Sequence, residues 1–158
     1  MMKPNIGLSA KDCTEVVHVL NTLLSDEFIL YTKTLNYHWN ITGPHFHDLH
    51  KLLDTQYHEL LETIDSVAER VRSLGGHALG SLLEFTQNTR LKEEPHKYPS
   101  AKIMISNLLS DHESIIANLR KDLETCQLKH HDAGTTDFLT GLMEHHEKTA
   151  WMLRALLE

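Results

Sequence analysis

The sequence predicts an all-α protein, a bundle of four long helices with a short extra helix in a long crossover between the second and third. Two observations predict this class. Apolar residues recur at helical spacing in four long stretches. The chain also has only 7 glycines and 4 prolines, the residues that most often interrupt helices. Amphipathic helices of this length bury their apolar stripes against one another in a bundle. We expect a single domain over residues 1–158.

The first helix is expected to begin near Ser9, a suitable N-cap, and to run to about Asn40. After a short turn, Pro44 fits the first turn of the second helix, which the glycine pair 75–76 ends just after Leu74. The apolar tracks are Val16, Leu20, Leu23, Leu24, Ile29, Leu30 and Leu35 on the first helix, and Leu49, Leu53, Leu60, Ile64, Val67, Val71 and Leu74 on the second.

The third helix is expected over roughly residues 100–126, and the fourth from about Thr135 to the end. Between the second and third helices, residues 75–99 form a connection of about 25 residues, which is too long for a hairpin between neighbouring helices. We therefore expect a crossover that runs along the bundle. Inside it, residues 78–85 have the apolar pattern of a short extra helix.

Composition narrows the classes of function. No apolar run approaches the roughly 20 residues that span a bilayer. Residues 1–5 have no apolar signal core, so we expect a cytoplasmic protein. The net charge of −7 argues against a strongly electrostatic nucleic-acid binder. Cys13 and Cys126 match no CxxC motif, and a disulfide between them is not expected in a reducing compartment.

The chain has 13 histidines, which favours metal chemistry, although a polar surface rich in histidine is the simpler alternative. On the second helix, His50 lies four residues before Asp54, and Asp65 lies four before Glu69, so each pair shares a helix face. The two pairs are about 16 Å apart along the helix axis, whereas metal–ligand bonds are roughly 2 Å long. One helix therefore cannot bring both pairs to the same ion.

A second copy of the helix would solve this problem. The pairings 50 with 69 and 54 with 65 share one centre, between Glu59 and Leu60. If two copies pack antiparallel about a two-fold axis at that centre, His50 of one chain meets Glu69 of the partner subunit. Asp54 then meets Asp65 of the partner subunit, and the dyad generates two equivalent sites.

His38 completes the predicted donor set. It ends the first helix five residues before Gly43, and His50 follows seven residues after that glycine, so an antiparallel hairpin brings both histidines to one end of the bundle. Two imidazoles from one chain and two carboxylates from its neighbour suit iron(II), although zinc, cobalt or manganese could also bind. The same acidic pairs also fit an ordinary solvated helix face.

Two sequence runs carry a resemblance to a known family. Residues 36–54, NYHWNITGPHFHDLHKLLD, and residues 65–76, DSVAERVRSLGG, resemble the two signatures of the Dps family, the DNA-binding proteins from starved cells. The helix layout extends the resemblance over nearly the whole chain. It implies a ferritin-like four-helix bundle that assembles into a hollow homododecamer with ferroxidase sites at two-fold interfaces.

The resemblance also assigns residues. It implies that one subunit supplies His38, His50 and Asp54 as metal ligands, and that its partner supplies Asp65 and Glu69. Asp54 either ligates the same iron or holds a second, weaker one. Trp39 matches the aromatic residue beside the site, where it could equally pack against the end of the hairpin.

Two further features bear on iron. Asp132 and Asp137 resemble the family's acidic pore at a three-fold axis, where a ring of carboxylates would attract iron(II); capping of the last helix is the alternative. The ferritin pattern of two Glu-x-x-His pairs on two helices of one subunit is missing. Glu15 and His18 form one such pair, but no second is well placed, so an intrasubunit di-iron site is not expected.

The sequence thus predicts an iron-storing, iron-detoxifying ferroxidase that limits oxidative damage. The resemblance implies hydrogen peroxide as the favoured oxidant, molecular oxygen as the slower one, and an iron(III) mineral in the cavity. A DNA-protecting nucleoid protein is one alternative, but the first 15 residues hold only Lys3 and Lys11 as basic groups, and the chain stops at Leu157 and Glu158 without a basic tail. A helical bundle that holds zinc structurally is the other alternative.

Overall fold

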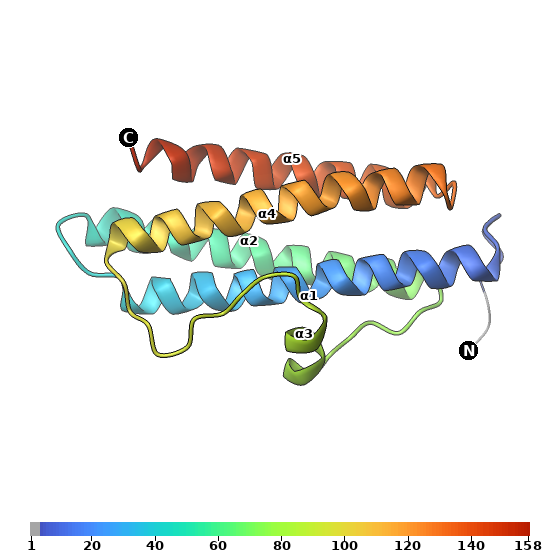
Figure 1. Ribbon diagram of the computed structural model, residues 1–158, viewed down its shortest axis with the longest axis horizontal. Helices are drawn as coiled ribbons and strands as arrows, with labels where there is room; N and C mark the ends of the chain where they lie inside the picture. The colour runs from blue at the N-terminus through green and yellow to red at the C-terminus, as the bar shows by residue number, and fades with distance from the viewer. Residues whose placement is uncertain (1–3) are drawn as a thin grey trace.

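The structure is a computed structural model in which residues 4–158 are described. In that range it is entirely helical: α1 (Ala10–Asn40), α2 (Phe46–Ser73), α3 (Leu82–Asn88), α4 (Ala101–Leu128) and α5 (Ala133–Ala155). The helices α1 and α2 form one antiparallel hairpin, α4 and α5 form another, and the two lie side by side as a bundle (Figure 1). The crossover forms α3 beside the middle of α1 and then returns along the bundle to α4. The predicted all-α bundle with an extra helix in its crossover is confirmed.

The helix ends follow their local signals. The Ser9 hydroxyl accepts a hydrogen bond from the Asp12 amide at 3.1 Å, so Ser9 is the N-cap of α1 as predicted. At the same end of the hairpin, the glycine stop of α2 is also confirmed. Gly75 has a φ of +81°, and the Gly76 amide donates to the Val71 carbonyl at 3.1 Å.

Two predicted boundaries were wrong. The helix α2 begins at Phe46, and Pro44 lies in the preceding turn, where the Phe46 amide donates to the Gly43 carbonyl at 3.1 Å. The extra helix was expected over residues 78–85 but covers Leu82–Asn88. Ser81 sets this later start through a capping box.

That capping box holds the start of α3 in both directions. The Glu84 carboxylate accepts from the Ser81 amide at 3.0 Å, and the Ser81 hydroxyl accepts from the Glu84 amide at 3.4 Å. The segment before it is bound to α1 instead, because the Leu79 amide donates to the Asn21 side chain at 3.0 Å. An extended segment tied to α1 in this way cannot be part of α3.

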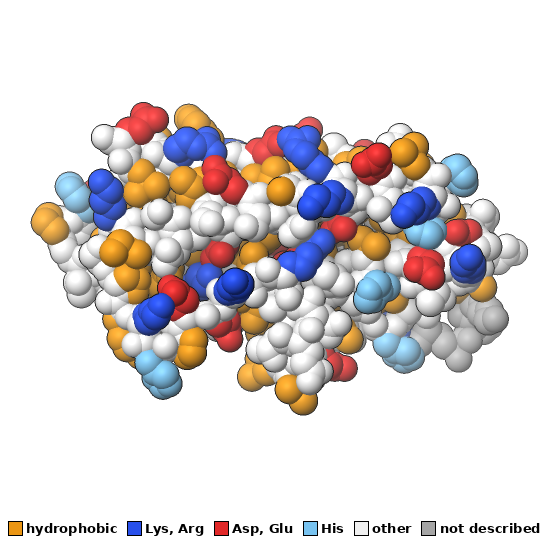
Figure 2. All heavy atoms as spheres, in the orientation of Figure 1, with side chains coloured by type: hydrophobic (Ala, Val, Ile, Leu, Met, Phe, Trp, Pro, Cys, Tyr) orange, Lys and Arg blue, Asp and Glu red, His pale blue; other side chains and the backbone are white. Residues whose placement is uncertain are grey.

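The core lies between the two hairpins and takes its apolar side chains from all four long helices. Leu20, Leu53, Leu108 and Leu139, one from each long helix, are fully buried. Each such side chain stabilises the fold by roughly 1.5–3 kcal/mol relative to an exposed one. None of the helices in the described part of the chain has the length and hydropathy needed to cross a membrane. Charged side chains of both signs are interspersed over the face in Figure 2.

A buried carboxylate fastens the crossover to the bundle. Asp26 on α1 is fully buried and accepts from the Arg90 amide at 2.6 Å, from the Arg90 guanidinium at 2.7 Å and from the Thr89 hydroxyl at 2.9 Å. The same guanidinium donates to Asp122 on α4 at 2.9 Å. Arg90 therefore joins α1, the crossover and α4 at one point.

Arg90→Ala should lower the free energy of unfolding by about 2–3 kcal/mol. Removing one partner of a buried pair costs roughly 3–5 kcal/mol, and the partly exposed Arg90 guanidinium moves the expectation to the lower end. Urea unfolding at fixed protein concentration measures the effect. Lys97→Ala, which breaks the exposed pair with Glu94, is the control and should cost less than about 1 kcal/mol. Equal losses in the two variants would contradict the buried clamp.

Both cysteines are buried free thiols. Burial raises the pKa of the Cys126 thiol to about 12. A thiol with so high a pKa carries almost no thiolate at neutral pH and is therefore a poor nucleophile. Cys126 acts in this fold as a small apolar side chain between α4 and the other helices.

Candidate metal centre

The last turn of α1 and the first turns of α2 place His38 against His50. Their rings stack with centroids 3.8 Å apart and an interplanar angle of 19°. The His38 Nδ1 lies 3.0 Å from the His50 carbonyl oxygen, and the His50 Nδ1 lies 2.9 Å from the His38 carbonyl oxygen. The two histidines thus hold each other through the main chain of the opposite helix.

This reciprocal arrangement fixes the tautomer of both rings. A carbonyl oxygen can only accept, so the hydrogen on each neutral ring sits on Nδ1. The Nε2 of each imidazole then carries a free lone pair, which is the form that binds a metal. A ligating histidine commonly donates its other ring N–H to a carbonyl, which orients the ring and raises its basicity. His38 and His50 therefore form a preorganised pair of nitrogen donors.

Asp54 lies one turn further along α2, beside this pair. Its Oδ1 is 4.0 Å from the His38 Nε2, and its Oδ2 is 3.8 Å from the Nδ1 of His58. The Tyr57 ring meets the His38 ring edge-on at 5.2 Å between centroids. Burial, and then the nearby Asp54 carboxylate, raise the pKa of Tyr57. One end of the hairpin thus gathers His38, His50 and Asp54, with Tyr57 packed behind them.

The other two predicted ligands lie elsewhere on the same helix. Asp65 and Glu69 are exposed on α2, toward its far end from His50. Asp65 borders a shallow depression of about 450 Å³ whose other lining residues are Leu61, Glu62, Ile64 and Ala68. Within residues 4–158 of one subunit, no group of three or more His, Cys, Asp or Glu side chains converges so that it could hold a metal ion.

The remaining predicted residues have clear surroundings. The Trp39 side chain is exposed and does not pack into its own subunit. Asp132 is buried as the N-cap of α5, where its carboxylate accepts from the Thr135 amide at 2.9 Å and from Arg70 at 3.2 Å. The capping alternative therefore describes what Asp132 does within the subunit. Asp137 is exposed on α5, and a pore role for either aspartate stays a prediction.

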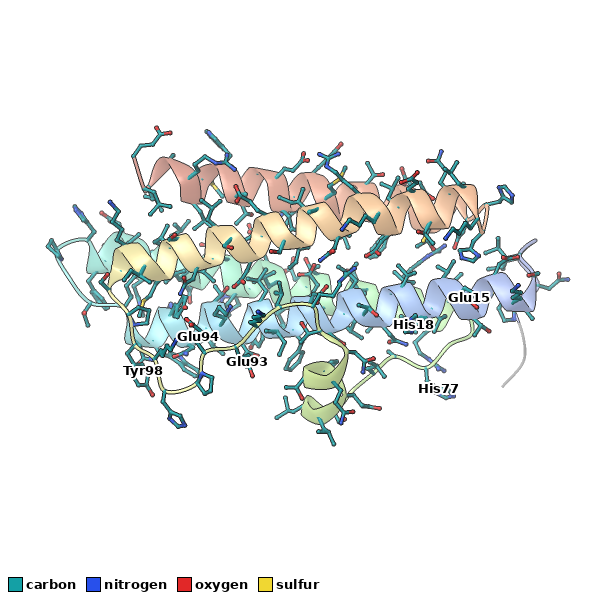
Figure 3. The ribbon with its side chains drawn as sticks, in the orientation of Figure 1. Glu15, His18, His77, Glu93, Glu94 and Tyr98 are labelled. Carbon is teal, nitrogen blue, oxygen red and sulfur yellow. The ribbon has the colours of Figure 1, made fainter. Side chains whose placement is uncertain are left out.

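Glu15 and His18 are exposed on the N-terminal part of α1, beside the region of His77 in the crossover (Figure 3). They lie far along α1 from His38, which occupies its last turn. These two side chains are therefore separate from the His38–His50 pair, as the assignment in the sequence requires.

Sequence reasoning missed a set of polar side chains in the centre of the bundle: Glu27, His112 and His146 are all buried. A signal for them was present. His112 lies between Leu108 and Ile115 on the apolar stripe of α4, and His146 lies seven residues from both Leu139 and Leu153 on α5. A titratable residue in phase with a leucine stripe is expected to be buried.

Comparison with known proteins shows the family to which the chain belongs. The model of the ferritin-like domain matches residues 17–158. The chain is 34% identical to DNA protection during starvation protein 2 of Bacillus anthracis, over 90% of this chain and 97% of that protein. The chain belongs to the Dps family. An uncharacterized low temperature-induced protein of Nostoc is more similar to this Dps chain, at 47% identity over 100% of this chain and 88% of its own length.

Solved Dps structures have the same fold. DpsC from Streptomyces coelicolor superposes with a TM-score of 0.95 at 33% identity, covering 100% of this chain and 91% of its own. A Dps protein from Vibrio cholerae, described as a member of a broad superfamily of ferritin-like diiron-carboxylate proteins, gives 0.92 at 28% identity, covering 100% and 98%. The ferritin-like fold and the Dps family predicted from the sequence are both confirmed.

Proposed function

We propose that this Dps protein stores iron and oxidises iron(II) at sites shared between two subunits. The observation that carries the proposal is the His38–His50 pair, whose two Nε2 lone pairs are free for a metal, while residues 4–158 of the same subunit supply no complete donor set. Membership in the ferritin-like family, which includes diiron-carboxylate proteins, supports iron as the metal.

The second half of each site comes from the partner's α2. An antiparallel dimer of α2 centred between Glu59 and Leu60 brings His50 of one subunit to Glu69 of the partner subunit. Leu61, next to that centre, is a large apolar side chain that is 48% exposed in the single subunit. Its burial between two copies of α2 would stabilise such a dimer. The proposed assembly is a homododecamer built from these dimers.

Iron(II) is the substrate of this site. Two imidazole nitrogens and the carboxylates hold it, and the negative charge of the carboxylates stabilises the iron(III) that forms. With hydrogen peroxide as oxidant, two iron(II) ions each lose one electron. The peroxide O–O bond breaks, and with two protons the two oxygen atoms leave as two waters. Molecular oxygen is the slower oxidant, and the iron(III) collects as mineral inside the cage, which protects against oxidative damage.

The iron must reach the cavity, and exposed Asp137 is the residue proposed to line its entrance. A ring of such carboxylates at a three-fold axis would concentrate iron(II) ahead of the site. Asp132 is the weaker candidate, because its carboxylate already bonds Arg70 and the start of α5. The entrance therefore depends mainly on Asp137.

Protection of DNA by direct binding is the second candidate function, because curated relatives carry the name DNA protection during starvation protein. Charge opposes it. The net charge is −7, and the face in Figure 2 has no continuous basic stripe. Lys11 lies in the first turn of α1, and Lys3 lies outside the described residues.

We expect no retardation of duplex DNA near neutral pH at moderate salt. An acidic cage repels phosphate, and the counterion release that drives such binding needs clustered lysine or arginine. A gel-shift titration with a basic DNA-binding protein as positive control measures it. Tight binding that weakens as salt rises would overturn this expectation and favour the nucleoid function.

A structural zinc site is the third candidate, and iron chemistry separates it from the first. A ferroxidase consumes peroxide in proportion to added iron(II) and produces the absorbance of iron(III) mineral. A structural zinc protein does neither, because zinc has no redox chemistry. Anaerobic loading with iron(II), followed by peroxide, with absorbance and particle mass recorded, is the deciding experiment.

A further inference from the structure

A chain of three buried titratable side chains crosses the bundle interior, away from the proposed iron site. The Glu27 Oε1 on α1 lies 2.8 Å from the His146 Nε2 on α5. The other ring nitrogen of His146, Nδ1, lies 2.8 Å from the Nδ1 of His112 on α4. Glu27 and His146 are 0% exposed, and His112 is 2% exposed. These three hydrogen-bonded side chains therefore link the α1–α2 hairpin to the α4–α5 hairpin in a region without water access.

Only one hydrogen atom can lie between the facing Nδ1 atoms of His112 and His146. A hydrogen bond between two ring nitrogens needs one N–H and one free lone pair. If His112 and His146 were both fully protonated, two N–H groups would face each other across 2.8 Å, and the bond would become a repulsion between two cations. The closed form of the chain is thus restricted to states in which one of these two nitrogens is bare.

A second proton on His112 would sit on its Nε2, which has no hydrogen-bond partner within reach. The Glu27 Oε2, the His112 Nε2 and both polar atoms of the Gln56 amide on α2 are buried without a hydrogen-bond partner. Tyr31 on α1 faces Tyr57 on α2, so Gln56 lies within about one to two helical turns of Glu27 along the axis. A further titratable pair adjoins the cluster: the His145 ring on α5 lies 6.0 Å from the His146 ring, and its Nε2 lies 3.7 Å from Glu59 on α2.

The surroundings of His112 all lower its pKa. Burial, and then the neighbouring imidazoles of His146 and His145, hold the pKa of His112 well below its ordinary value of 6.5. Once the hairpins separate, His112 is hydrated and takes up a proton at that ordinary value. Opening therefore binds a proton in the pH range below about 6.5 and above the lowered pKa of the closed form.

We propose that Glu27, His146 and His112 form an acid-released latch between the two helical hairpins of each subunit. Its sign follows from the proton balance. The open form binds more protons, so the latch is fully effective above pH about 6.5 and loses its effect as the pH falls below that value. For one proton taken up at pH about 6.5, the equilibrium constant for opening rises about fivefold from pH 6.5 to 5.5 and approaches a tenfold rise per pH unit below that.

Hydrogen–deuterium exchange on the full-length assembled protein tests the latch. Exchange is measured at pH 7.5, 6.5 and 5.5 and corrected for the intrinsic pH dependence of amide exchange. Amides of α4 around His112 and of α5 around His146 should show an opening constant that rises about fivefold between pH 6.5 and 5.5. Amides of the same helices far from the latch give the internal reference.

The variant His112→Gln keeps a polar group that can bond the His146 ring but cannot titrate, so its opening constant should stay flat over the same range. His18→Gln, an exposed histidine on α1, is the matched control and should follow the unmodified protein. A slope in His112→Gln equal to that of the unmodified protein would overturn the proposal. A metal ion that the cluster retains after chelator treatment would also overturn it, because a metal would occupy the nitrogens that bond each other.

A second measurement decides the matter if His112→Gln fails to fold. Solid-state NMR of the protein labelled with 15N-histidine identifies His112 and His146 by the coupling between their facing Nδ1 atoms. We expect the two ring nitrogens of His112 to keep, at pH 5.5, the different 15N chemical shifts that are typical of a neutral imidazole. An equal pair of protonated nitrogens there, with a midpoint near 6.5 in the folded protein, would contradict the latch.

Discussion

His50→Ala should slow peroxide-driven iron oxidation by about tenfold to a hundredfold, while the helices stay intact. Loss of a group that only orients a metal ligand already costs roughly that much, and His50 is proposed as a ligand itself. The fold should survive because His50 is only partly buried and the core leucines are untouched. Stopped-flow absorbance of iron(III) gives the rate, and circular dichroism gives the helix content.

Asp65→Ala should have a similar effect although it lies about 22 Å from His50 along α2. The reason is that the proposed site takes Asp65 from the partner subunit. His18→Ala is the control, since His18 is exposed on α1 far from His38 and should leave the rate within about twofold. Equal losses in all three variants would remove the ligand assignment.

Co-assembly of two inactive variants should restore about a quarter of the sites. One chain lacks the nitrogen donors (His38→Ala with His50→Ala), and the other lacks the carboxylates (Asp65→Ala with Glu69→Ala). Each homogeneous cage should be nearly inactive. In a mixed dimer the two-fold axis gives one site with all its ligands and one with none. Half of the dimers are mixed under random assembly, and each contributes one of its two sites.

Two affinity tags on the two chains allow the mixed cages to be purified after co-expression. Iron oxidation by the doubly tagged cages is then compared with each homogeneous cage and with the unmodified protein. A site built within one subunit predicts no recovery, because every chain would still lack part of its own site. Verified mixed cages without recovery would therefore show that the ligands are not shared across the interface.

Most of the fold could be predicted because its signals are local. The 3.6-residue recurrence of leucine fixes the four long helices, and Ser9 and Gly75 mark two of their ends through backbone geometry alone. The start of α3 was misplaced because two effects compete there. The apolar pattern begins at Ala78, but Leu79 is bonded to Asn21, 58 residues earlier in the chain, and a sequence pattern does not record that contact.

The proposed metal site likewise has one part that local sequence signals predict and another part that they do not. The hairpin turn fixed by Gly43 brings His38 to His50, so this half could be read from spacing, whereas the reciprocal carbonyl contacts that orient the rings could not. The other half needs a second chain. The buried hydrogen-bonded set Glu27, His146 and His112 was missed because helical periodicity shows that a position is buried without saying what its side chain bonds.

The exposed position of Trp39 also decides what an optical signal from this protein would report. The chain has 2 tryptophans, and both lie on the surface of the subunit, with Trp39 68% and Trp151 63% exposed. Their fluorescence should therefore change little when an isolated subunit unfolds, since the indoles are hydrated before and after. If the emission shifts to shorter wavelength as the protein concentration is raised, the shift would instead report the association of subunits. Each indole would then be covered by a neighbouring subunit.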